Sequence, residues 1–282
     1  METIGKQHTD HANRILVTGG TGTLGRLVVA RLRDAGREVR VLSRHGREPA
    51  DGLEYATADL GTGEGIEAAV EGAETIVHCA GSTKGDEEKA ANLVRAALPA
   101  GARHLVHISV VGADRVPVES ALDRAMFGYF ASKLGAERVV TDSGLRWTTL
   151  RATQFHDLML TTASGMARLP VIPVPSGFRF QPVDADEVAA PLVELALGAP
   201  AGLVPDIAGP RVYDMADLVH AYLHARGKHR LMVPLRLPGK AARALRAGAN
   251  LAPDRAVGRL SWEDFLAERL SASSPNGSGP SN

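Results

Sequence analysis

Residues 14–26 read RILVTGGTGTLGR, and this stretch decides the fold class. An aliphatic run stops at closely spaced glycines, and an apolar helical pattern follows from Leu24 onward. A strand, a glycine turn and a helix in this order are the context in which such a motif predicts a dinucleotide site. Glycine lets the chain turn without a Cβ clash, and the amides at the helix start favour a phosphate. The spacing is G-x-x-G-x-x-G, through Gly19, Gly22 and Gly25.

Outward from this stretch, apolar runs and helical patterns alternate as far as residue 151. The runs predict strands at 14–18, 38–43, 53–57, 74–80, 103–109 and 146–151. The periodic segments predict helices at 23–36, 64–71, 86–100 and 121–142. Strict alternation predicts an α/β fold with a doubly wound parallel sheet, which binds ligands at the carboxyl ends of its strands.

The rhythm changes after residue 151, where four prolines between residues 170 and 182 predict an irregular stretch. A helix is expected at 185–198, opened by Asp184 or Asp186 and interrupted by Pro191. Further strands are expected at 203–208 and 230–236, and helices at 213–226, 240–248 and 261–270. The predicted organisation is a disordered terminus at 1–12, a dinucleotide-binding core at 13–152, a smaller C-terminal α/β substrate-binding region at 153–270 interleaved with that core, and a disordered tail at 271–282.

Composition limits the kinds of partner and the cellular location that we expect for this chain. The 282 residues hold 32 Lys and Arg against 32 Asp and Glu, so no global field favours nucleic acid or a membrane as partner. Cys79 is the only cysteine, which excludes a disulfide framework and favours a reducing, cytoplasmic location. The first residues lack the apolar core of a signal peptide, and no apolar run approaches a membrane span. We therefore expect a small-molecule substrate, and the oligomeric state stays open between monomer and homodimer.

The second predicted strand ends at Ser43 and Arg44. In NAD-binding sheets an acidic residue at this position bonds the ribose 2′-hydroxyl, whereas a basic residue suits a 2′-phosphate. Arg44 offers a planar fork of donors that matches a phosphate, and Arg47 lies close enough in sequence to assist. The position predicts NADP(H) in preference to NAD(H), with a solvated loop arginine as the alternative.

The third and fourth predicted strands end in further candidates for the coenzyme site. Asp59, followed by Leu60, either bonds the adenine amino group or caps the next helix. The fourth strand ends in four small residues, which let the backbone lie against the ribose and nicotinamide: Cys79, Ala80, Gly81 and Ser82. Cys79 has no activating neighbour, so it is interpreted as a packing residue rather than a nucleophile.

The fifth predicted strand ends at Ser109, and Tyr129 and Lys133 follow in the next predicted helix. Four residues apart on a helix, the two side chains share one face. A Tyr-x-x-x-Lys pair in a chain with four tyrosines is rarely a coincidence at this place in the order of elements. The alternative is a surface tyrosine beside a solvated lysine.

With these residues the chain resembles a short-chain dehydrogenase/reductase of the atypical, NmrA-like branch, a family with a Rossmann fold. The narrower likeness rests on TGGTGTLG at 18–25, VHISVVGAD at 106–114, WTTLRATQFH at 147–156 and QPVDADEVA at 181–189. The resemblance implies that Ser43 and Arg44 bind the 2′-phosphate. It also implies that the pyrophosphate lies on Thr18, Gly19, Gly20, Thr21, Gly22, Thr23, Leu24 and Gly25.

The same resemblance assigns chemical roles. Ser109 would hydrogen-bond the substrate oxygen, Tyr129 would act as general acid or base, and Lys133 would hold the nicotinamide ribose and favour the tyrosinate. The helix asparagine of the family falls near Asp86 here, and Asn92 is interpreted as a helix-face residue. The nicotinamide end of the pocket would be lined by Thr153, Gln154, Phe155 and His156.

Three functions follow from this resemblance. The first is an NADPH-dependent reductase or dehydrogenase that acts on a small, hydrophobic carbonyl or hydroxyl compound. The second is an NmrA-like redox sensor that binds NADP without turnover, and the third uses the bound nucleotide for epimerisation or dehydration. An intact Ser109, Tyr129 and Lys133 set favours the first, because a sensor needs no proton donor beside the nicotinamide.

Other polar patterns carry no predicted site. His220 and His224 are spaced for one helix face but lack a third ligand, so no metal is predicted. His104 and His107 point to opposite faces of a strand. The basic helix with Lys240, Arg243 and Arg246 has the spacing of a solvated face.

Overall fold

The structure is a computed structural model, and it describes residues 14–49 and 53–271. The disorder predicted at the two termini lies outside these ranges, except for Ser271, which ends a helix. The chain forms two compact units that interleave along the sequence. Unit 1 takes its described residues from Met1–Ile108, Gly135–Thr149 and Ala189–Leu203, and unit 2 from Ser109–Leu134, Leu150–Val188 and Val204–Asn282.

A seven-stranded sheet has the order β3-β2-β1-β4-β5-β6-β9. Its strands are β1 (Arg14–Thr18), β2 (Glu38–Ser43), β3 (Leu53–Thr57), β4 (Ala73–His78), β5 (His104–Val110), β6 (Trp147–Ala152) and β9 (Gly202–Leu203). The central strand β1 pairs in parallel with both β2 and β4, so the chain reverses its direction of winding beside β1. Ligands of doubly wound sheets bind at this switch point.

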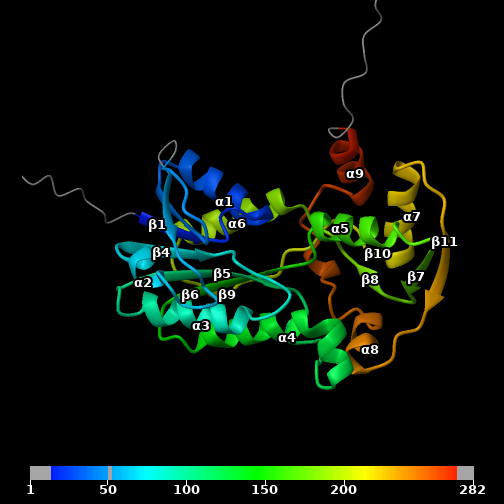
Figure 1. Cartoon of the computed structure of the whole chain (residues 1–282), viewed down its shortest axis with the longest axis horizontal. Helices are drawn as coiled ribbons and strands as arrows, with labels where there is room; N and C mark the ends of the chain where they lie inside the picture. The colour runs from blue at the N-terminus through cyan, green and yellow to red at the C-terminus, as the bar shows by residue number, and fades with distance from the viewer. Residues whose placement is uncertain (1–13, 50–52, 272–282) are drawn as a thin grey trace, which may run out of the picture. The chain divides into compact units, whose positions relative to one another are not determined.

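Helices cover both faces of the sheet in unit 1 (Figure 1). α1 (Thr23–Asp34) and the unit 1 part of α6 (Ala185–Leu197) lie on one face, while α3 (Asp86–Ala97) and the unit 1 part of α4 (Ala121–Thr141) lie on the other. The short α2 (Ile66–Val70) precedes β4. Fully buried aliphatic side chains from strands and helices fill the core between these layers, among them Leu16, Ile76, Leu93 and Leu105. The predicted doubly wound α/β fold is confirmed.

Unit 2 packs helices against two small sheets. The helices are α5 (His156–Met166), α7 (Met215–Ala225), α8 (Lys240–Arg246) and α9 (Trp262–Ser271), with a 3₁₀ turn at Pro253–Arg255. β8 (Arg179–Phe180) pairs antiparallel with β10 (Tyr213–Asp214), and β7 (Val171–Pro175) pairs in parallel with β11 (Leu231–Leu235). Large apolar side chains fill the core of this unit, including Phe127, Phe178, Leu218 and Trp262.

Two predictions for unit 2 are wrong. The proline-rich stretch is not irregular throughout, because residues 171–175 form β7, in which the buried Ile172 and Val174 alternate with Pro173 and Pro175. The strand expected at 203–208 is interrupted: Gly202–Leu203 forms β9, and further along Ile207 makes an isolated bridge with Ala152 of β6. The alternate burial of aliphatic residues explains why the proline-rich stretch forms β7. Its prolines are tolerated because β7 has an open edge.

Helix α5 is not predicted by the sequence, because its residues HDLMLTTASGM include many poor helix formers. The hydroxyls of Thr161 and Thr162 donate to the carbonyls of Asp157 and Leu158, at 2.9 and 2.8 Å, so they are satisfied inside the helix. The helix at α6 is confirmed although Pro191 lies within it. Asp184 opens α6, since its Oδ1 accepts the amide of Asp186 at 2.8 Å.

Across residues 14–49 and 53–271, none of the helices combines the length and the apolar character that crossing a bilayer requires.

Candidate functional site

A cavity of about 420 Å³ lies in unit 1 at the carboxyl ends of β1, β2 and β4. This is the place where a doubly wound sheet binds its ligand. Eleven of the residues predicted for the coenzyme line it, and four further residues join them. The lining consists of Gly19, Thr21, Gly22, Leu42, Ser43, Arg44, His45, Arg47, Asp59, Leu60, Cys79, Ala80, Gly81, Ser82 and Lys89.

The turn between β1 and α1 requires glycine at two places. Gly19 has a φ of +67°, and a Cβ there would lie 2.6 Å from the Ala80 nitrogen. A Cβ on Gly25 would lie 2.1 Å from the carbonyl oxygen of Gly19. The turn therefore presses against the end of β4 on one side and against the first turn of α1 on the other, and any side chain would separate them.

The start of α1 is open to an anion. Its N-cap is Gly22, no side chain bonds the free amides, and its first turn holds no acidic residue. Gly22 and Thr21 are exposed at the cavity. Unpaired helix amides and the helix dipole together favour a phosphate at this position.

Positive charge dominates the cavity lining. The lining contains three basic side chains, those of Arg44, Arg47 and Lys89, and one carboxylate, that of Asp59. β2 ends at Ser43, and no acidic residue stands at its end. The Asp59 Oδ1 accepts the amide of Gly61 at 2.7 Å, while the N-cap of α2 is Gly65, so Asp59 closes its own turn rather than capping α2.

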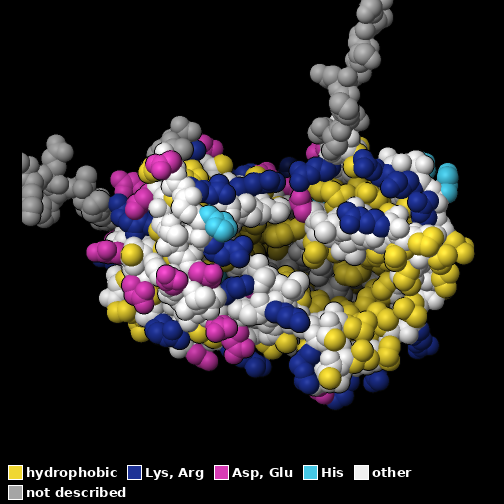
Figure 2. Space-filling view, viewed as in Figure 1, with side chains coloured by type: hydrophobic (Ala, Val, Ile, Leu, Met, Phe, Trp, Pro, Cys, Tyr) yellow, Lys and Arg dark blue, Asp and Glu magenta, His cyan; other side chains and the backbone are white. Residues whose placement is uncertain are grey.

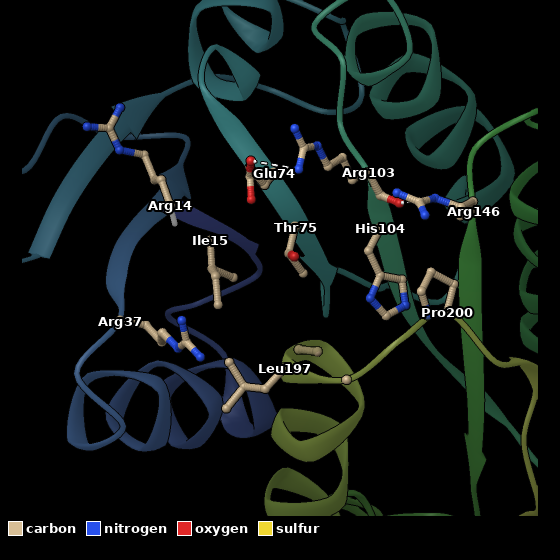
Figure 3. Close-up of a pocket in the computed structure, with 12 residues that line it drawn as sticks. Arg14, Ile15, Arg37, Glu74, Thr75, Arg103, His104, Arg146, Leu197 and Pro200 are labelled. Atoms are coloured by element: carbon tan, nitrogen blue, oxygen red, sulfur yellow. Dashed lines mark hydrogen bonds and ion pairs between the residues drawn. The ribbon is translucent and has the colours of Figure 1, made fainter. Parts of the chain in front are cut away.

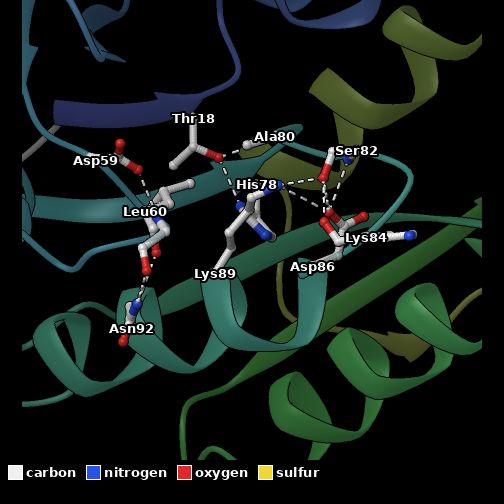
Figure 4. Close-up of polar contacts among 11 residues, drawn as sticks. Thr18, Asp59, Leu60, His78, Ala80, Ser82, Lys84, Asp86, Lys89 and Asn92 are labelled. Carbon is white, nitrogen blue, oxygen red and sulfur yellow. Dashed lines mark hydrogen bonds and ion pairs between the residues drawn. The ribbon is translucent and has the colours of Figure 1, made fainter.

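Five of the eight residues predicted for the pyrophosphate do not line this cavity: Thr18, Gly20, Thr23, Leu24 and Gly25. Lys133, predicted for the nicotinamide ribose, is not in the lining either. Thr18 is fully buried, its Oγ1 lies 2.7 Å from His78 Nδ1, and it accepts the amide of Ala80 at 3.3 Å (Figure 4). Thr18 and Gly25 thus pack against the glycine turn or the end of β4, and they fix the backbone that faces the cavity.

A polar network fixes the loop after β4 (Figure 4). Asp86 is buried at the start of α3, and its Oδ1 accepts the amide of Ser82 at 2.8 Å. Lys89 donates to Ser82 Oγ and lies 3.4 Å from Asp86 Oδ1. Asp86 thus orders this loop and holds the Lys89 ammonium at the cavity.

Two residues of α3 have roles that the sequence does not reveal. Lys89 lies three positions after Asp86, one helical turn along α3, and this spacing is the available signal. The interpretation of Asn92 as a helix-face residue is incomplete, because its amide nitrogen donates to the carbonyl of Leu60 at 2.8 Å. Asn92 therefore ties α3 to the loop after β3.

A second cavity of unit 1, about 240 Å³ in volume, lies at the amino ends of β1, β4 and β5 (Figure 3). Two of the four arginines in its lining have acidic partners: Arg103 lies 3.4 Å from Glu74, and Arg14 lies 3.6 Å from Glu54. The glycine turn contributes nothing to its lining. Its place at the amino ends of the strands, away from the glycine turn, excludes it as the coenzyme site.

The predicted catalytic residues all lie in unit 2. Ser109 stands near the end of β5, is buried, and its Oγ has no hydrogen-bond partner among residues 14–49 and 53–271. Tyr129 and Lys133 lie one turn apart on α4, with the Lys133 ammonium 5.8 Å from the Tyr129 ring centroid. Lys133 is only 6% exposed, so the alternative of a solvated lysine fails.

The residues after β6 divide into two kinds. Thr153 is buried and its hydroxyl donates to the carbonyl of Gln181 at 2.6 Å, which makes it part of the scaffold. The side-chain amide atoms Nε2 and Oε1 of Gln154 are buried without a hydrogen-bond partner in the described part of the chain. Buried polar atoms without partners in the protein are candidates for ligand contacts. The predicted lining therefore depends on Gln154 and the half-buried Phe155.

His156 belongs to an aromatic stack. Its ring centroid lies 4.9 Å from that of Phe265 and 5.9 Å from that of Trp262. Burial lowers the pKa of His156 to about 4, against the opposing effect of Asp184, whose carboxylate lies 4.0 Å away. A neutral, fully buried imidazole supports the core of unit 2 and is a poor proton donor.

The histidine pairs on α7 and β5 differ in their surroundings. His220 and His224 are exposed on α7, and the described residues contain no group of three potential metal ligands. His104 is buried, with Nε2 lying 2.8 Å from Thr148 Oγ1. Burial, followed by the nearby Arg146, lowers the pKa of His104.

Known structures share this fold. An NADPH-dependent quinone oxidoreductase from Escherichia coli, solved with NADPH, is 18% identical with a TM-score of 0.74, over 91% of this chain and 99% of that one. A UDP-glucose 4-epimerase from Thermus thermophilus, solved with NAD, is 20% identical with a TM-score of 0.67, over 93% and 100%.

Curated relatives are more similar in sequence. A (4-alkanoyl-5-oxo-2,5-dihydrofuran-3-yl)methyl phosphate reductase from Streptomyces griseus is 32% identical over 56% of this chain, and the match spans about half of the relative, 54%. A ceramide reductase from Caulobacter vibrioides is 28% identical over 82% of this chain and 76% of the relative. The sequence profile of the NAD(P)H-binding family matches residues 19–196, which include the glycine turn, the charged cavity lining and the Tyr–Lys pair. The chain belongs to the NAD(P)H-binding family.

Proposed function

We propose that this chain is an NADPH-dependent oxidoreductase that reduces the carbonyl group of a small, apolar organic compound. The observation that carries this proposal is the burial of Lys133 beside Tyr129 on α4. Burying an ammonium is costly unless it is paired or hydrogen-bonded, and lysine is seldom fully buried in proteins, so a buried lysine beside a tyrosine is a candidate for a functional role. A cation held over a phenol is an arrangement suited to proton transfer.

The cavity of unit 1 supports NADPH over NADH. The glycine turn and the open start of α1 fit a pyrophosphate. Arg44 at the end of β2, with Arg47 nearby, fits a 2′-phosphate, and the carboxylate that would bind a free 2′-hydroxyl is missing there. Lys89 adds a further positive charge to the lining.

The chemistry divides between coenzyme and protein. The reduced coenzyme, when bound, supplies the hydride that becomes the new carbon–hydrogen bond. Tyr129 then donates its phenolic proton to the substrate oxygen, which completes the alcohol, and a proton from solvent restores the phenol. Lys133 stabilises the transient phenolate through its charge, and Ser109 donates a hydrogen bond to the oxygen as negative charge develops on it.

Buried polar atoms that lack partners within the described ranges support a substrate-binding site in unit 2. Ser109 Oγ and the amide of Gln154 are both buried in unit 2, and each has unused hydrogen-bonding capacity within the described ranges. Such groups favour a polar substrate atom in an otherwise apolar setting. Relatives named as a phosphate ester reductase, a ceramide reductase and an azoreductase support reduction of a small molecule without agreeing on one substrate.

The test is oxidation of NADPH by the full chain with a panel of ketones, aldehydes and quinones. With an active substrate, Tyr129→Phe should lower kcat by about 10²-fold or more while the Kd for NADPH stays unchanged, since loss of a general acid removes about that much rate. Tyr222→Phe, which removes a buried hydroxyl from the same unit, is the matched control and should keep full activity. Full turnover by Tyr129→Phe would refute the catalytic assignment. NADPH binding without turnover of any substrate would instead indicate a coenzyme sensor.

A further inference from the structure

The two-stranded sheet of β7 and β11 is apolar on both of its faces. Ile172 and Val174 of β7 point inward and are buried. The outward positions pair in register as Leu231 with Val171, Val233 with Pro173 and Leu235 with Pro175. All six outward residues are apolar, whereas the outer face of an antiparallel or mixed surface sheet ordinarily carries polar side chains. We call these six residues the β7–β11 face.

This face is exposed. Leu231 is 65% exposed, Leu235 is 48% exposed and Val171 is 45% exposed. Figure 2 shows hydrophobic side chains gathered over β7 and β11. Contiguous exposed apolar groups of this kind mark an interaction surface rather than ordinary scatter.

Basic residues surround the strand β11 in the sequence. From Leu218 to Pro253 the chain holds no Asp or Glu, although the whole chain balances 32 basic against 32 acidic residues. Arg226, Lys228 and Arg230 precede β11 and Arg236 follows it, and all four are exposed. Lys240 is left out of this set because it pairs with Glu119. Basic residues therefore dominate the chain on either side of β11, while Asp214 and Asp217 are the acidic residues that lie beside β7 and β11, in a pocket with Val174 and Pro234.

We propose that the β7–β11 face docks onto an anionic lipid surface. Aliphatic side chains enter the boundary between headgroups and acyl chains, and the arginine and lysine residues on either side of β11 bind the anionic headgroups. The contact is peripheral: the unit lies on the bilayer, and no element of it crosses.

Two other occupants fit less well. A second copy docked through the same face would place one set of these basic residues against another, because a two-fold interface brings each patch onto itself. Pairing with an added strand is hindered by Pro173, Pro175 and Pro234, which donate no backbone hydrogen bond. The six side chains also include no Trp, Tyr or Arg, the anchors that are typical of protein interfaces.

The experiment is co-sedimentation of the full chain with vesicles. Pure phosphatidylcholine vesicles are compared with vesicles that contain about 30% phosphatidylglycerol, at about 0.1 M and about 0.5 M salt. The expected result is at least about tenfold stronger partition onto the anionic vesicles at low salt, and a marked loss at high salt.

Variants separate the two parts of the face. Leu231→Glu with Val233→Glu should abolish vesicle binding, and Arg226→Ala with Lys228→Ala and Arg230→Ala should weaken it about 100-fold and reduce its salt dependence. These side chains are exposed, so folding should survive, and unchanged NADPH binding verifies that it does. Val257→Glu, at a residue 62% exposed in the same unit, is the matched control and should bind vesicles like the original chain.

Three outcomes would overturn the proposal. One is equal or absent binding to both kinds of vesicle. Another is a dimer in sedimentation velocity that Leu231→Glu with Val233→Glu converts to a monomer, which would assign the face to self-association. The third is binding to soluble poly-glutamate without binding to vesicles, which would assign the face to an acidic protein. Failure of this proposal would leave the oxidoreductase proposal untouched, because its test depends on Tyr129 and not on this face.

Discussion

At the scale of single residues, we expect Arg44 to decide which coenzyme the cavity prefers. It stands at the end of β2, where the sheet of an NAD-specific protein carries an acid, and it lines the cavity. Arg44→Ala should raise the Kd for NADPH by about 10- to 100-fold, since a hydrogen bond between charged groups contributes about 1.5–3 kcal/mol. The Kd for NADH, which lacks the phosphate, should change by less than about threefold. Calorimetric titration of both coenzymes measures the two constants.

Arg44→Lys is the informative companion to this variant. Lysine keeps the charge but loses the planar fork, so the Kd of Arg44→Lys for NADPH should lie between that of the original chain and that of Arg44→Ala. If Arg44→Ala left the ratio of NADPH affinity to NADH affinity unchanged, Arg44 would not be the residue that selects NADPH.

His156 makes the stability of the protein depend on pH. Its pKa is about 4 in the folded chain, against 6.5 for a histidine exposed to water, so the unfolded chain binds more protons between these values. The folded state is therefore fully favoured above about pH 6.5 and loses this stability as the pH falls toward 4. The free energy of unfolding should fall by about 2 kcal/mol more between about pH 7.5 and pH 5 than in His156→Gln, which does not titrate. Urea denaturation of both proteins at the two pH values measures the difference, and parallel losses would contradict the assignment.

Sequence predicts the cavity residues well where one rule decides their place. The carboxyl ends of parallel strands meet at one edge, so Ser43, Asp59 and Cys79 are expected together and are found together. Lys89 escapes prediction because its place depends on the bonds among Ser82, Asp86 and Lys89, which connect a loop with the next helix. Such a network has no periodicity in the sequence, and only the fold brings its members into contact.

At the scale of elements, the contact between α1 and the glycine turn sets the geometry of the phosphate site. Gly25→Ala would place a Cβ 2.1 Å from a backbone oxygen, so α1 must move away from the turn. We expect a loss of about 1–3 kcal/mol in the free energy of unfolding, the range typical of overpacking, together with at least about tenfold weaker NADPH binding. Urea denaturation and calorimetric titration provide the two measurements.

The control for this variant is Gly165→Ala in α5, where nothing lies within 4 Å of the added Cβ. Alanine stabilises an open helical position by about 0.5–1 kcal/mol relative to glycine, and NADPH binding should not change. If Gly25→Ala behaved like this control, the close packing of α1 on the turn would be refuted.

The elements of the sheet are predictable because β1, β4 and β5 are buried on both faces and appear as continuous apolar runs. In unit 2 the predicted helices α7, α8 and α9 and the predicted strand β11 are confirmed, but two elements escape prediction. The short strand β7 alternates prolines with buried aliphatic residues, and α5 is built from residues that disfavour helices in isolation. Packing within the unit selects both elements, and packing cannot be seen in a local stretch of sequence.

At the scale of the whole molecule, the charged cavity lies entirely in unit 1, so coenzyme binding should stabilise the backbone of that cavity first. Free NADPH at about 100 times its Kd stabilises the binding-competent state by about 2.7 kcal/mol through mass action. Hydrogen exchange should therefore slow by up to about 100-fold at amides of 18–25, 42–48 and 79–89, because local opening must release the ligand. Mass spectrometry of exchange with and without NADPH measures this protection, and Arg44→Ala at the same NADPH concentration should show a smaller gain. Unchanged exchange in these three segments at saturating NADPH would show that the coenzyme binds elsewhere.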